Sequence, residues 1–533
     1  MPRSNDAYAH MREGDLPGDR GELEASADPY AGGEARDLPI WTPDQIAAHL
    51  NRSGFSWDVS KDKVITYGFY DGPTTTGIYN NPHEAAETYG YSPFNEAQRA
   101  AAREAMRMWD DVVAVKFQED SKGHGNWDIS FANTTTGPGQ AWAYLPHGTY
   151  YGSKYQHIQG DIWVNPAQPS NMQLDPGFYG LTTLIHEAGH AIGLSHPGDY
   201  NASDDVELSY ALADYFQDSR QYSIMSYWDA YETGGQHIDW NLMRFSYAST
   251  PMVHDIYAAQ KMYGADMTTR TGNTVYGFNS NTGIDAFTFE ANEIAPVIAI
   301  WDAGGNDTLD LSGYDTPSII DLNPGAYSSA GGTVEFLSLE EINANNAAAG
   351  LPDRSAFLYE VYMNGVAGTN GGESWREISN SETGLMKDNI GIAYGATIEN
   401  AVGGGGDDSI LGNSVGNRLS GKGGDDTIEG GAGNDTLEGG AGADTFVFRT
   451  AEKGDQIVAF DADDVIDLAA IDANSTAAGD QAFTFVAGNF TGAGQLRVAN
   501  GQVEGDLNGD GTADLIIKLV GGGIAPTGAD FVL

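Results

Sequence analysis

Residues 184–197 read LIHEAGHAIGLSHP and bring together three histidines and one glutamate. On a helix, His186 and His190 are four residues apart, so they lie one turn apart on the same face. Both imidazoles can then reach one metal ion. Glu187 stands beside that face, where it can hydrogen-bond a water on the metal. The stretch therefore predicts a helix that carries part of a metal site.

The end of this stretch supplies a third ligand. Gly193 can cap the helix and let the chain reverse, which brings His196 back toward the metal. Pro197 prevents the helix from resuming. Three histidines leave one coordination position open for water, whose pKa zinc can lower to near 7, and Glu187 can take its proton. A short H-E-x-x-H match can be a helix with surface histidines, but the longer H-E-x-x-H-x-x-G-x-x-H pattern is much rarer by chance.

Composition limits the kinds of site and partner. The 533 residues include no cysteine, which excludes disulfides and thiolate metal sites. A balance of 26 basic against 75 acidic residues gives a net charge of −49, which argues against nucleic acid as a partner. The charge suits a protein that holds many cations, or it serves solubility alone. No apolar run reaches the length of a membrane helix, so we expect no membrane insertion.

A nine-residue repeat begins at Gly403. In nines the chain reads GGGGDDSIL, GNSVGNRLS, GKGGDDTIE, GGAGNDTLE and GGAGADTFV. This matches the calcium nonapeptide pattern G-G-x-G-x-D-x-U-x. The sixth positions are Asp408, Asn417, Asp426, Asp435 and Asp444, and the eighth are Ile410, Leu419, Ile428, Leu437 and Phe446.

The repeat has a physical reading. Glycines allow a tight turn whose carbonyls point inward, and the aspartate supplies a hard oxygen ligand for calcium. The apolar eighth residue lies on a short strand and stacks on neighbouring coils. A flexible glycine-rich linker is the alternative, but five coils with an apolar residue at one fixed place argue against it.

Composition shifts divide the chain into segments. We expect a leader at 1–40, a mixed α/β domain at 41–264, a repeat domain at 265–446 with an insertion at about 333–388, and a strand-rich region at 447–533. Helices are predicted at 95–113 and 180–193, and strands at 127–132 and 161–165. The expected core face of the first helix is Ala97, Ala101, Ala105, Met108, Trp109 and Val112.

Further motifs carry a resemblance to a known family. YSIMSYW at 222–228 places Met225 in a turn after the histidines, as in the metzincin signature. RTGNTVYGFNSNTG (270–283), IWDAGGNDTLDLSGY (300–314) and GATIENAVGG (395–404) accompany the repeats. From about Ile40 to Leu533 the chain resembles the serralysins, secreted bacterial zinc proteases. The resemblance implies an α+β metzincin zinc-protease domain, then an all-β parallel β-roll of the RTX type and a C-terminal β-sandwich-like secretion region.

The resemblance also implies roles for the metal-site residues. His186, His190 and His196 would bind Zn(2+), with Tyr227 as a weak further ligand that hydrogen-bonds the developing oxyanion. Glu187 would be the general base, and Met225 would form an apolar floor. His157, His237 and His254 are interpreted as structural. An edge strand that receives the substrate peptide would comprise Ala141, Trp142, Ala143 and Tyr144.

Several Ca(2+) ions are implied in the same way. Their positions are Arg270, Gly272, Thr274, Asp302, Gly304, Gly305, Asp307, Thr397, Glu399, Gly404, Gly406, Asp408, Asn417, Gly424, Asp426, Gly431, Gly433, Asp435, Gly440, Gly442 and Asp444.

Export and activity follow from the resemblance as expectations. The chain lacks an N-terminal secretory signal and ends in Asp530 followed by three apolar residues, as in proteins exported by a type I secretion apparatus. We expect a monomeric, extracellular zinc endopeptidase acting on protein substrates, made as a zymogen. The alternatives are a calcium-dependent surface or adhesion protein with a vestigial protease domain, and a protein that processes its own leader. The insertion receives no function from the sequence.

Overall fold

The computed structural model describes residues 34–71, 90–120, 127–136, 139–147, 158–200, 209–522 and 524–533. Contacts divide the chain into two compact units. The first unit holds residues up to Thr269 together with Ile294–Trp301 and Glu335–Tyr394. The second holds Arg270–Glu293, Asp302–Val334 and Gly395–Leu533. Of the expected leader, 1–33 lies outside the described residues.

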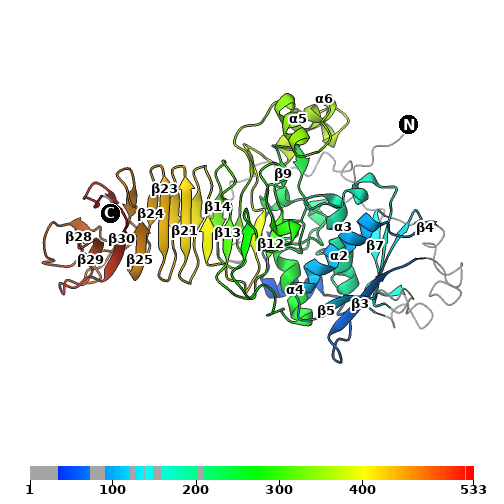
Figure 1. Ribbon diagram of the computed structural model, residues 1–533, viewed down its shortest axis with the longest axis horizontal. Helices are drawn as coiled ribbons and strands as arrows, with labels where there is room; N and C mark the ends of the chain where they lie inside the picture. Colours follow the sequence, from blue (N-terminus) through cyan, green and yellow to red (C-terminus); the bar gives the residue numbers. More distant parts are fainter. Residues whose placement is uncertain are drawn as a thin grey trace. The chain divides into compact units, whose positions relative to one another are not determined.

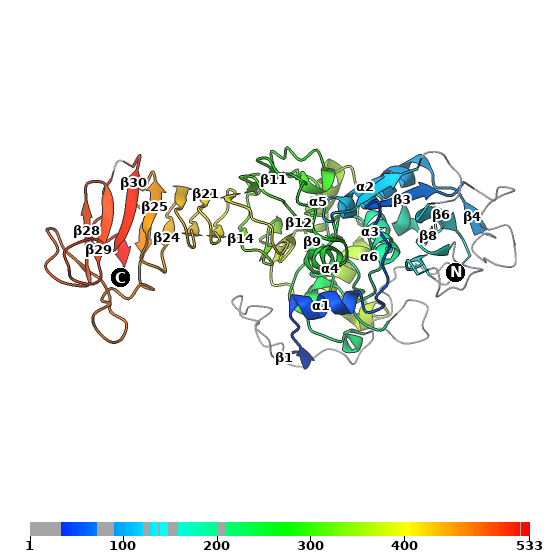
Figure 2. The same cartoon turned by 90° about the horizontal axis from the view of Figure 1, so that it is seen from below.

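The first unit is built on one mixed sheet. Its strands run in the order β5–β3–β6–β8–β7; the first four are parallel, and β7 pairs antiparallel at the edge. Strand β4 adds antiparallel to β6. Helix α2 packs against α3, and α3 contacts β7 and β8 (Figure 1, Figure 2). The bounds are β3 Val64–Phe69, β4 Tyr91–Ser92, α2 Glu96–Asp110, β5 Lys116–Glu119, β6 Ile129–Thr134, β7 Ala141–Ala143, β8 Asp161–Val164 and α3 Tyr179–Ile192.

The rest of the first unit surrounds this sheet and helix pair. It includes an antiparallel hairpin, β9–β10, and a parallel pair, β12–β18. The bounds are β1 Glu34–Ala35, β2 Leu38–Pro39, α1 Pro43–Leu50, β9 Ile238–Asp239, β10 Arg244–Phe245, α4 Val253–Tyr263, β12 Ile298–Ile300, α5 Leu339–Ala348, α6 Ala356–Met363, α7 Trp375–Ile378, β17 Gly384–Leu385 and β18 Ile390–Ile392.

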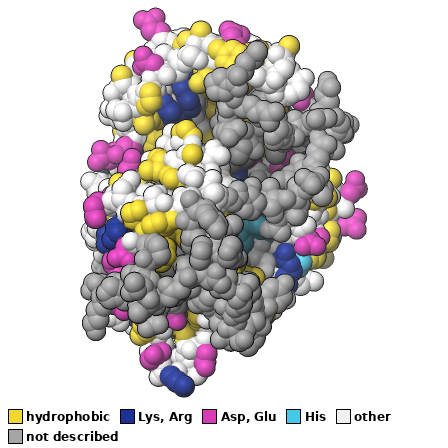
Figure 3. Space-filling model, turned by 90° about the vertical axis from the view of Figure 1, so that its right-hand side faces the viewer, with side chains coloured by type: hydrophobic (Ala, Val, Ile, Leu, Met, Phe, Trp, Pro, Cys, Tyr) yellow, Lys and Arg dark blue, Asp and Glu magenta, His cyan; other side chains and the backbone are white. Residues whose placement is uncertain are grey.

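Side-chain types are unevenly distributed on the surface. On the described part of the face in Figure 3, hydrophobic side chains gather in a band, whereas charged ones stand mostly apart. None of the helices in the described residues combines the length and apolar character needed to cross a membrane.

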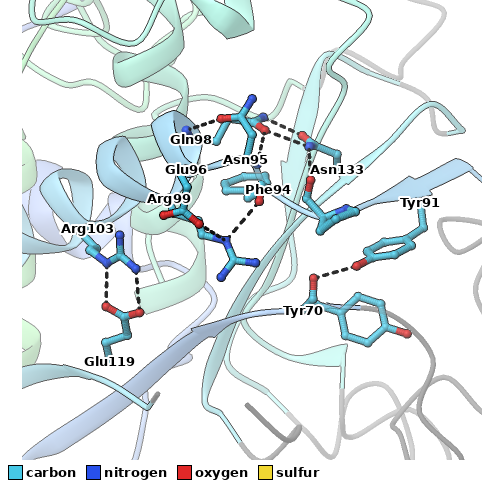
Figure 4. A network of polar contacts seen from close by, with 11 residues as sticks. Tyr70, Tyr91, Phe94, Asn95, Glu96, Gln98, Arg99, Arg103, Glu119 and Asn133 are labelled. Atoms are coloured by element: carbon cyan, nitrogen blue, oxygen red, sulfur yellow. Dashed lines mark hydrogen bonds and ion pairs between the residues drawn. The ribbon is translucent and has the colours of Figure 1, made fainter. Parts of the chain in front are cut away.

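Helix α2 confirms the helix predicted at 95–113, but one residue of the predicted core face is not buried. Asn95 caps it, since Asn95 Oδ1 accepts from Gln98 N at 2.9 Å and Gln98 Oε1 accepts from Asn95 N at 3.1 Å. Gln98 is buried because its Nε2 also donates to Asn133 Oδ1 on β6 at 2.8 Å (Figure 4). Ala97 was predicted to be buried and is exposed. On this face of the helix, the side-chain amide of Gln98 is therefore buried, whereas helical periodicity predicted that Ala97 would be.

The second unit consists mainly of two sheets between which the chain alternates. One follows the order β11–β13–β19–β21–β23–β25–β30–β29–β28–β27, and the other β14–β20–β22–β24–β26–β31. The bounds are β11 Val275–Gly277, β13 Thr308–Asp310, β14 Ile319–Asp321, β15 Tyr327–Ser328, β16 Gly332–Thr333, β19 Asn400–Val402, β20 Ser409–Leu411, β21 Arg418–Gly423, β22 Thr427–Glu429, β23 Thr436–Ala441, β24 Thr445–Val447, β25 Lys453–Val458, β26 Val465–Asp467, β27 Thr484–Phe485, β28 Gln495–Ala499, β29 Gln502–Asp506, β30 Leu515–Val520 and β31 Phe531–Val532.

The nonapeptides set this alternation. Ile410, Ile428 and Phe446 pair in register in one sheet, and Leu419 pairs with Leu437 in the other. All five side chains are at most 1% exposed, so the expectation of buried, strand-borne apolar residues is confirmed. Each residue stacks on the one 18 positions away, because consecutive repeats belong to opposite sheets.

The C-terminal strands extend these sheets. Strand β30 pairs parallel with β25 and antiparallel with β29, and β31 pairs parallel with β26 (Figure 2). The region expected to be sandwich-like thus adds its strands to the two sheets of the repeats.

The insertion belongs to the first unit, although in the sequence it lies between segments of the second unit. The sequence grouped 333–388 with the repeat domain, whereas contacts group Glu335–Tyr394 with the first unit. The reason is an apolar cluster in which Ile342, Val361, Tyr362 and Trp375 of the insertion are buried with residues of the first unit.

We predict that Leu437→Ala lowers the free energy of unfolding of the calcium-loaded second unit by about 2–5 kcal/mol, since it removes a fully buried side chain between paired strands. Hydrogen exchange of β21 to β25 in the full chain, measured against urea concentration, checks this. The matched control Val415→Ala alters a 39% exposed residue of the same repeats and should change stability by no more than about 0.5 kcal/mol. Equal effects of the two variants would contradict the assignment of Leu437 to a stabilising core.

Candidate metal centre

Helix α3 ends where the sequence predicts. Gly193 caps it with φ 117°, a conformation that side-chain-bearing residues rarely adopt, and an added Cβ would lie 2.2 Å from Phe55 O. Gly189 is required for a different reason: its Cβ would meet the Met225 sulfur at 2.6 Å. Met225 is fully buried, so it lies directly against the helix between the histidines, as expected of an apolar floor.

The three histidines converge on one point. His196 Nε2 lies 3.0 Å from His190 Nε2 and 3.3 Å from His186 Nε2. Zinc–nitrogen bonds of about 2.0–2.1 Å in tetrahedral geometry would separate the ligand atoms by about 3.3 Å. Within the described residues, these three form the group of histidine or carboxylate ligands that lie close enough to hold one ion.

Backbone carbonyls fix the proton of each ring. The Nδ1 atoms of His186, His190 and His196 lie 2.8, 2.7 and 2.8 Å from the carbonyl oxygens of Ile224, Leu194 and Tyr200. A carbonyl can only accept, so each Nδ1 carries the hydrogen and each Nε2 presents a lone pair. Three lone pairs that face one another repel unless a cation lies among them. This donor set therefore fits a zinc ion.

Burial gives the site its electrostatic character. Desolvation lowers the pKa of His186 to about 3 and that of His190 to about 4, which keeps both rings neutral and ready to bind metal. Desolvation raises the pKa of Glu187 to about 8. Glu187 Oε2 is buried with no hydrogen-bond partner in the described structure. A carboxyl group with a raised pKa is a strong base once it is ionised, so Glu187 is suited to deprotonate a water molecule beside the histidines.

Asp255 and Asp218, which the sequence did not single out, bind the segments that surround the metal ligands. Asp255 accepts from Ile224 N at 2.6 Å and Met252 N at 2.8 Å, which anchors the Met225 turn whose Ile224 carbonyl fixes the first histidine. Asp218 accepts from the Tyr200 hydroxyl at 2.9 Å, and also from Ser226 and Trp228. Asp255 also caps the start of α4 through Met252 N, but no local motif marks its bond to Ile224 or the bonds of Asp218, which join more distant residues.

The remaining expected residues of this site lie nearby. The ring of Tyr227 lies 4.4 Å from that of His196, between centroids. Strand β7 carries Ala141, Trp142 and Ala143 at the edge of the sheet and contacts α3, and Tyr144 follows it. Of the histidines interpreted as structural, His237 and His254 are buried, and His157 lies outside the described residues.

The repeat aspartates form two ladders in the second unit. Asp426 Oδ1 accepts from Asp408 N at 2.8 Å, and Asp444 Oδ1 from Asp426 N at 3.0 Å. In the other ladder, Asp435 Oδ1 accepts from Asn417 N at 2.8 Å. The opposite oxygen of Asp426 and of Asp444 is buried without a hydrogen-bond partner in the described structure. Unpartnered carboxylate oxygens in a row fit calcium, a hard cation that takes oxygen ligands.

The repeat glycines are placed to let these turns stack. An added Cβ on Gly442 would lie 2.0 Å from Gly424 O, one turn earlier in the same row, and Gly442 has φ 140°. The carbonyl of one turn thus lies directly against the glycine of the next turn in the row. Of the expected glycine positions, Gly440 lies near the end of β23, and the others lie between strands: Gly404, Gly406, Gly424, Gly431, Gly433 and Gly442.

Each ladder is one residue longer than predicted. Asp455 Oδ1 accepts from Asp435 N at 3.0 Å, and Asp464 Oδ1 from Asp444 N at 3.1 Å. Both follow their predecessor after 20 residues instead of 18, and neither has the repeat glycines. The signal that could have found them is an aspartate two residues before a buried apolar residue, Ile457 and Ile466.

The upstream calcium positions are partly brought together. Thr274 N donates to Asp307 Oδ1 at 2.7 Å, and Asp307 N donates to Glu399 Oε2 at 2.8 Å. Asp307 Oδ2 is buried without a partner in the described structure. Asp302 is committed to neighbours, since it accepts from the Tyr276 hydroxyl at 2.6 Å and from Gly304 N at 2.8 Å. The other expected positions lie in the same loops: Arg270, Gly272, Gly305 and Thr397.

Comparison with known proteins identifies the family. Residues 86–206 match the Matrixin family, and residues 265–355 and 369–533 match the family described as Peptidase M10 serralysin C terminal. The Metallopeptidase AprA of Pseudomonas marginalis is 37% identical over 505 residues, which cover 91% of this chain and 90% of that protein. The chain belongs to the serralysin family.

Other serralysins match over varying lengths. Serralysin G of Dickeya chrysanthemi is 34% identical over 518 residues, covering 93% of this chain and 92% of that protein. The Serralysin of Proteus mirabilis is 38% identical over 334 residues, covering 59% of this chain and 64% of that protein. Membership in the family gives zinc and calcium as the metals of this chain.

We predict that calcium binding to the ladders weakens as the pH falls through about 7 to 6. Burial and neighbouring carboxylates raise the pKa of Asp426 to about 7, and those of Asp435 and Asp444 to about 6, whereas calcium binds the ionised form. Without calcium the folded state holds more protons than the unfolded state, so its stability should rise as the pH falls across the same window. Calorimetric titration and circular dichroism measure the two trends.

A pair of variants tests the origin of this pH dependence. Asp426→Asn should weaken calcium binding and flatten the dependence, whereas Asp480→Asn alters an exposed residue away from the ladders and should leave it unchanged. Calcium affinity that is independent of pH would contradict the assignment of the ladders as ligands.

Proposed function

We propose that this serralysin is a secreted zinc endopeptidase that cleaves peptide bonds of extracellular proteins. The single observation that carries the proposal is the convergence of the Nε2 atoms of His186, His190 and His196 beside the unpartnered carboxylate of Glu187. These four residues supply a three-nitrogen metal site and a general base in one buried place.

The residues divide the chemistry among them. Bound zinc polarises the scissile carbonyl and makes water a better nucleophile. Glu187 takes the proton from the attacking water and delivers it to the leaving amine. Tyr227, whose ring stands beside that of His196, hydrogen-bonds the oxygen that becomes negative. The backbone carbonyls of Ile224, Leu194 and Tyr200 keep the histidine rings oriented throughout.

Strand β7 is the proposed docking edge for the substrate. Among the described residues, β7 pairs with β8 along one edge, and an extended peptide could add as a further strand along the opposite edge. Because β7 contacts α3, a peptide on Ala141–Ala143 would run past the helix that bears the histidines. Trp142 and Tyr144 are the large side chains available there for contact with the substrate.

We further propose that the second unit is a calcium-loaded β-roll that folds after export. Buried carboxylates stay unpaired without calcium, so low calcium inside the cell keeps this unit unfolded, and external calcium stabilises it by mass action. The segment ending in Asp530–Leu533 would be read by a type I secretion apparatus. Residues 1–40 would be a removable leader, and the mature enzyme would act as a monomer.

A calcium-dependent adhesion protein with a vestigial protease domain is the other class considered. Decay of an unused active site would be expected to strike one of its essential residues. His186, Glu187, His190, His196 and Tyr227 are all present, and backbone carbonyls orient the three histidine rings. The intact site therefore favours the enzyme.

We predict that Glu187→Gln lowers kcat/KM on casein by about 10²–10⁴-fold while zinc stays bound, because the change removes the base and retains every metal ligand. Steady-state kinetics with zinc analysis of the purified, calcium-loaded chain measures both. The exposed Glu382 on the insertion provides a control, since Glu382→Gln should leave both values unchanged.

We predict that Tyr227→Phe lowers kcat by about 10²–10³-fold with little change in KM, because its hydroxyl acts on the transition state. An equal effect on KM and kcat would indicate a role of Tyr227 in substrate affinity.

For the general base, full activity of the Glu187→Gln variant would overturn the proposed mechanism.

A further inference from the structure

A small cavity lies against the start of α3, the helix that carries His186 and His190. One side is formed by the chain that leaves the Met225 turn, with Asp229 two residues after Tyr227. The other side packs on the start of α3: Thr182 Oγ1 donates to Ala248 O at 2.7 Å, and Tyr247 stacks edge to face on Tyr179 at 5.0 Å between centroids. The cavity is lined by Arg220, Asp229, Ala230, Tyr231, Gln236, His237, Ile238, Phe245, Ser246, Tyr247 and Ala248.

The lining of the cavity is mixed, with three aromatic residues beside one ion pair. Aromatic rings of Tyr231, Phe245 and Tyr247 form much of the wall. The two charged side chains of the lining pair with each other, since Arg220 Nη1 lies 2.6 Å from Asp229 Oδ1, while Asp229 Oδ2 is buried without a hydrogen-bond partner in the described structure. A charged substrate group entering this buried place would lose its hydration and gain no unpaired countercharge.

Much of the cavity wall belongs to a weak structural element. His237, Ile238, Phe245 and Ser246 lie on or beside the hairpin β9–β10, whose two strands pair over two residues each. A two-stranded hairpin of this length is marginal by itself in water. Its position must therefore be fixed by what it packs against.

The insertion supplies that support through an apolar cluster. The ring of Phe245 lies 4.9 Å from that of Trp375, at 88°, and 6.2 Å from that of Tyr362. Trp375 and Tyr362 are outside the cavity lining, so they stand behind the wall. Ile238, Trp240 and Met243 of the hairpin region join the same buried cluster. In Figure 1, α5 and α6 lie beside β9.

Hydrogen bonds tie the hairpin to the insertion at both ends. Before β9, Gln236 exchanges two backbone hydrogen bonds with Lys387, at 2.9 and 3.0 Å. At the loop end, the buried Asn346 donates to Leu242 O at 3.1 Å and accepts from Arg244 Nε at 2.8 Å. Arg354 donates to Met243 O at 2.6 Å. The insertion thus holds the wall from the side opposite the cavity.

We propose that residues 335–394 are a specificity element: they fix the wall of this cavity and so determine the size of the apolar substrate side chain accepted next to the scissile bond. This inference rests on the proposed protease function and extends it to substrate selection. Trp375 and Asn346 act as positioning residues, because they reach the substrate only through Phe245 and the hairpin. Loosening either one widens the cavity and admits larger side chains.

Matched peptides test this proposal in the full, calcium-loaded chain. The peptides are identical except for alanine, leucine, phenylalanine or tryptophan at one position, on either side of the scissile bond in turn. For Trp375→Leu, we expect the ratio of kcat/KM for the tryptophan peptide to that for the alanine peptide to rise about tenfold at one of the two positions. The alanine peptide and the zinc content should stay within about twofold of wild type.

Further variants separate this role from a merely structural one. Asn346→Ala should shift the same ratio in the same direction, and it replaces Trp375→Leu if that variant fails to fold. Phe357→Ala, on α6 but 57% exposed, should leave the ratio unchanged. Unchanged ratios in both buried variants, or an equal loss for every peptide, would overturn the specificity role. A wild-type enzyme that cleaves no peptide or casein would instead refute the proposed function on which this inference rests.

Discussion

The repulsion among three imidazole lone pairs is the constraint on which the first unit depends. Each Nε2 points at the same place because a backbone carbonyl holds the opposite nitrogen of its ring. Such an arrangement is stable only with a cation at its centre, so the fold must supply rigidity to maintain it. Gly189 admits Met225 beneath the helix, and Asp255 anchors the turn that carries both Met225 and the Ile224 carbonyl. The packing around α3 thus serves the orientation of three rings.

The second unit follows the same physical rule with different ligands. Its strands place aspartates in rows, where burial and mutual repulsion raise their pKa values. Apolar residues such as Leu437 stack between the sheets and define the rows, but the carboxylate oxygens left without partners remain unfavourable until cations neutralise them. A net charge of −49 is consistent with a chain whose folded state is completed by bound metal. We therefore expect metal binding to stabilise the fold of both units.

Local spacing explains how much could be predicted from the sequence. Four-residue helical spacing and a glycine cap were sufficient for His186, His190 and Gly193, and the nine-residue period was sufficient for the ladder from Asp408 to Asp444. The ladder's last members, Asp455 and Asp464, were missed because the spacing lengthens to 20 residues and the glycines are lost. Gln98 was missed as a buried residue because its partner is on a distant strand.

Long-range packing explains the larger differences between the sequence-based predictions and the structure. The roles of Asp218 and Asp255 at the site have no motif, since their bonds to Tyr200 and to Ile224 join segments brought together only by folding. The insertion follows strands of the second unit in sequence, yet its apolar residues pack on Ile238 and Trp240 of the first unit. The apolar residues of such a segment indicate that it packs against something, but they do not indicate which part of the protein it packs against. That part is the one that holds the cavity wall.

Anomalous X-ray diffraction from crystals of the active, calcium-loaded chain, recorded on both sides of the zinc absorption edge, tests the central claim most directly. The account predicts a zinc peak at about 2.0–2.1 Å from the Nε2 atoms of His186, His190 and His196. Crystals of active enzyme with no zinc at this position, or with zinc held by other residues, would contradict it.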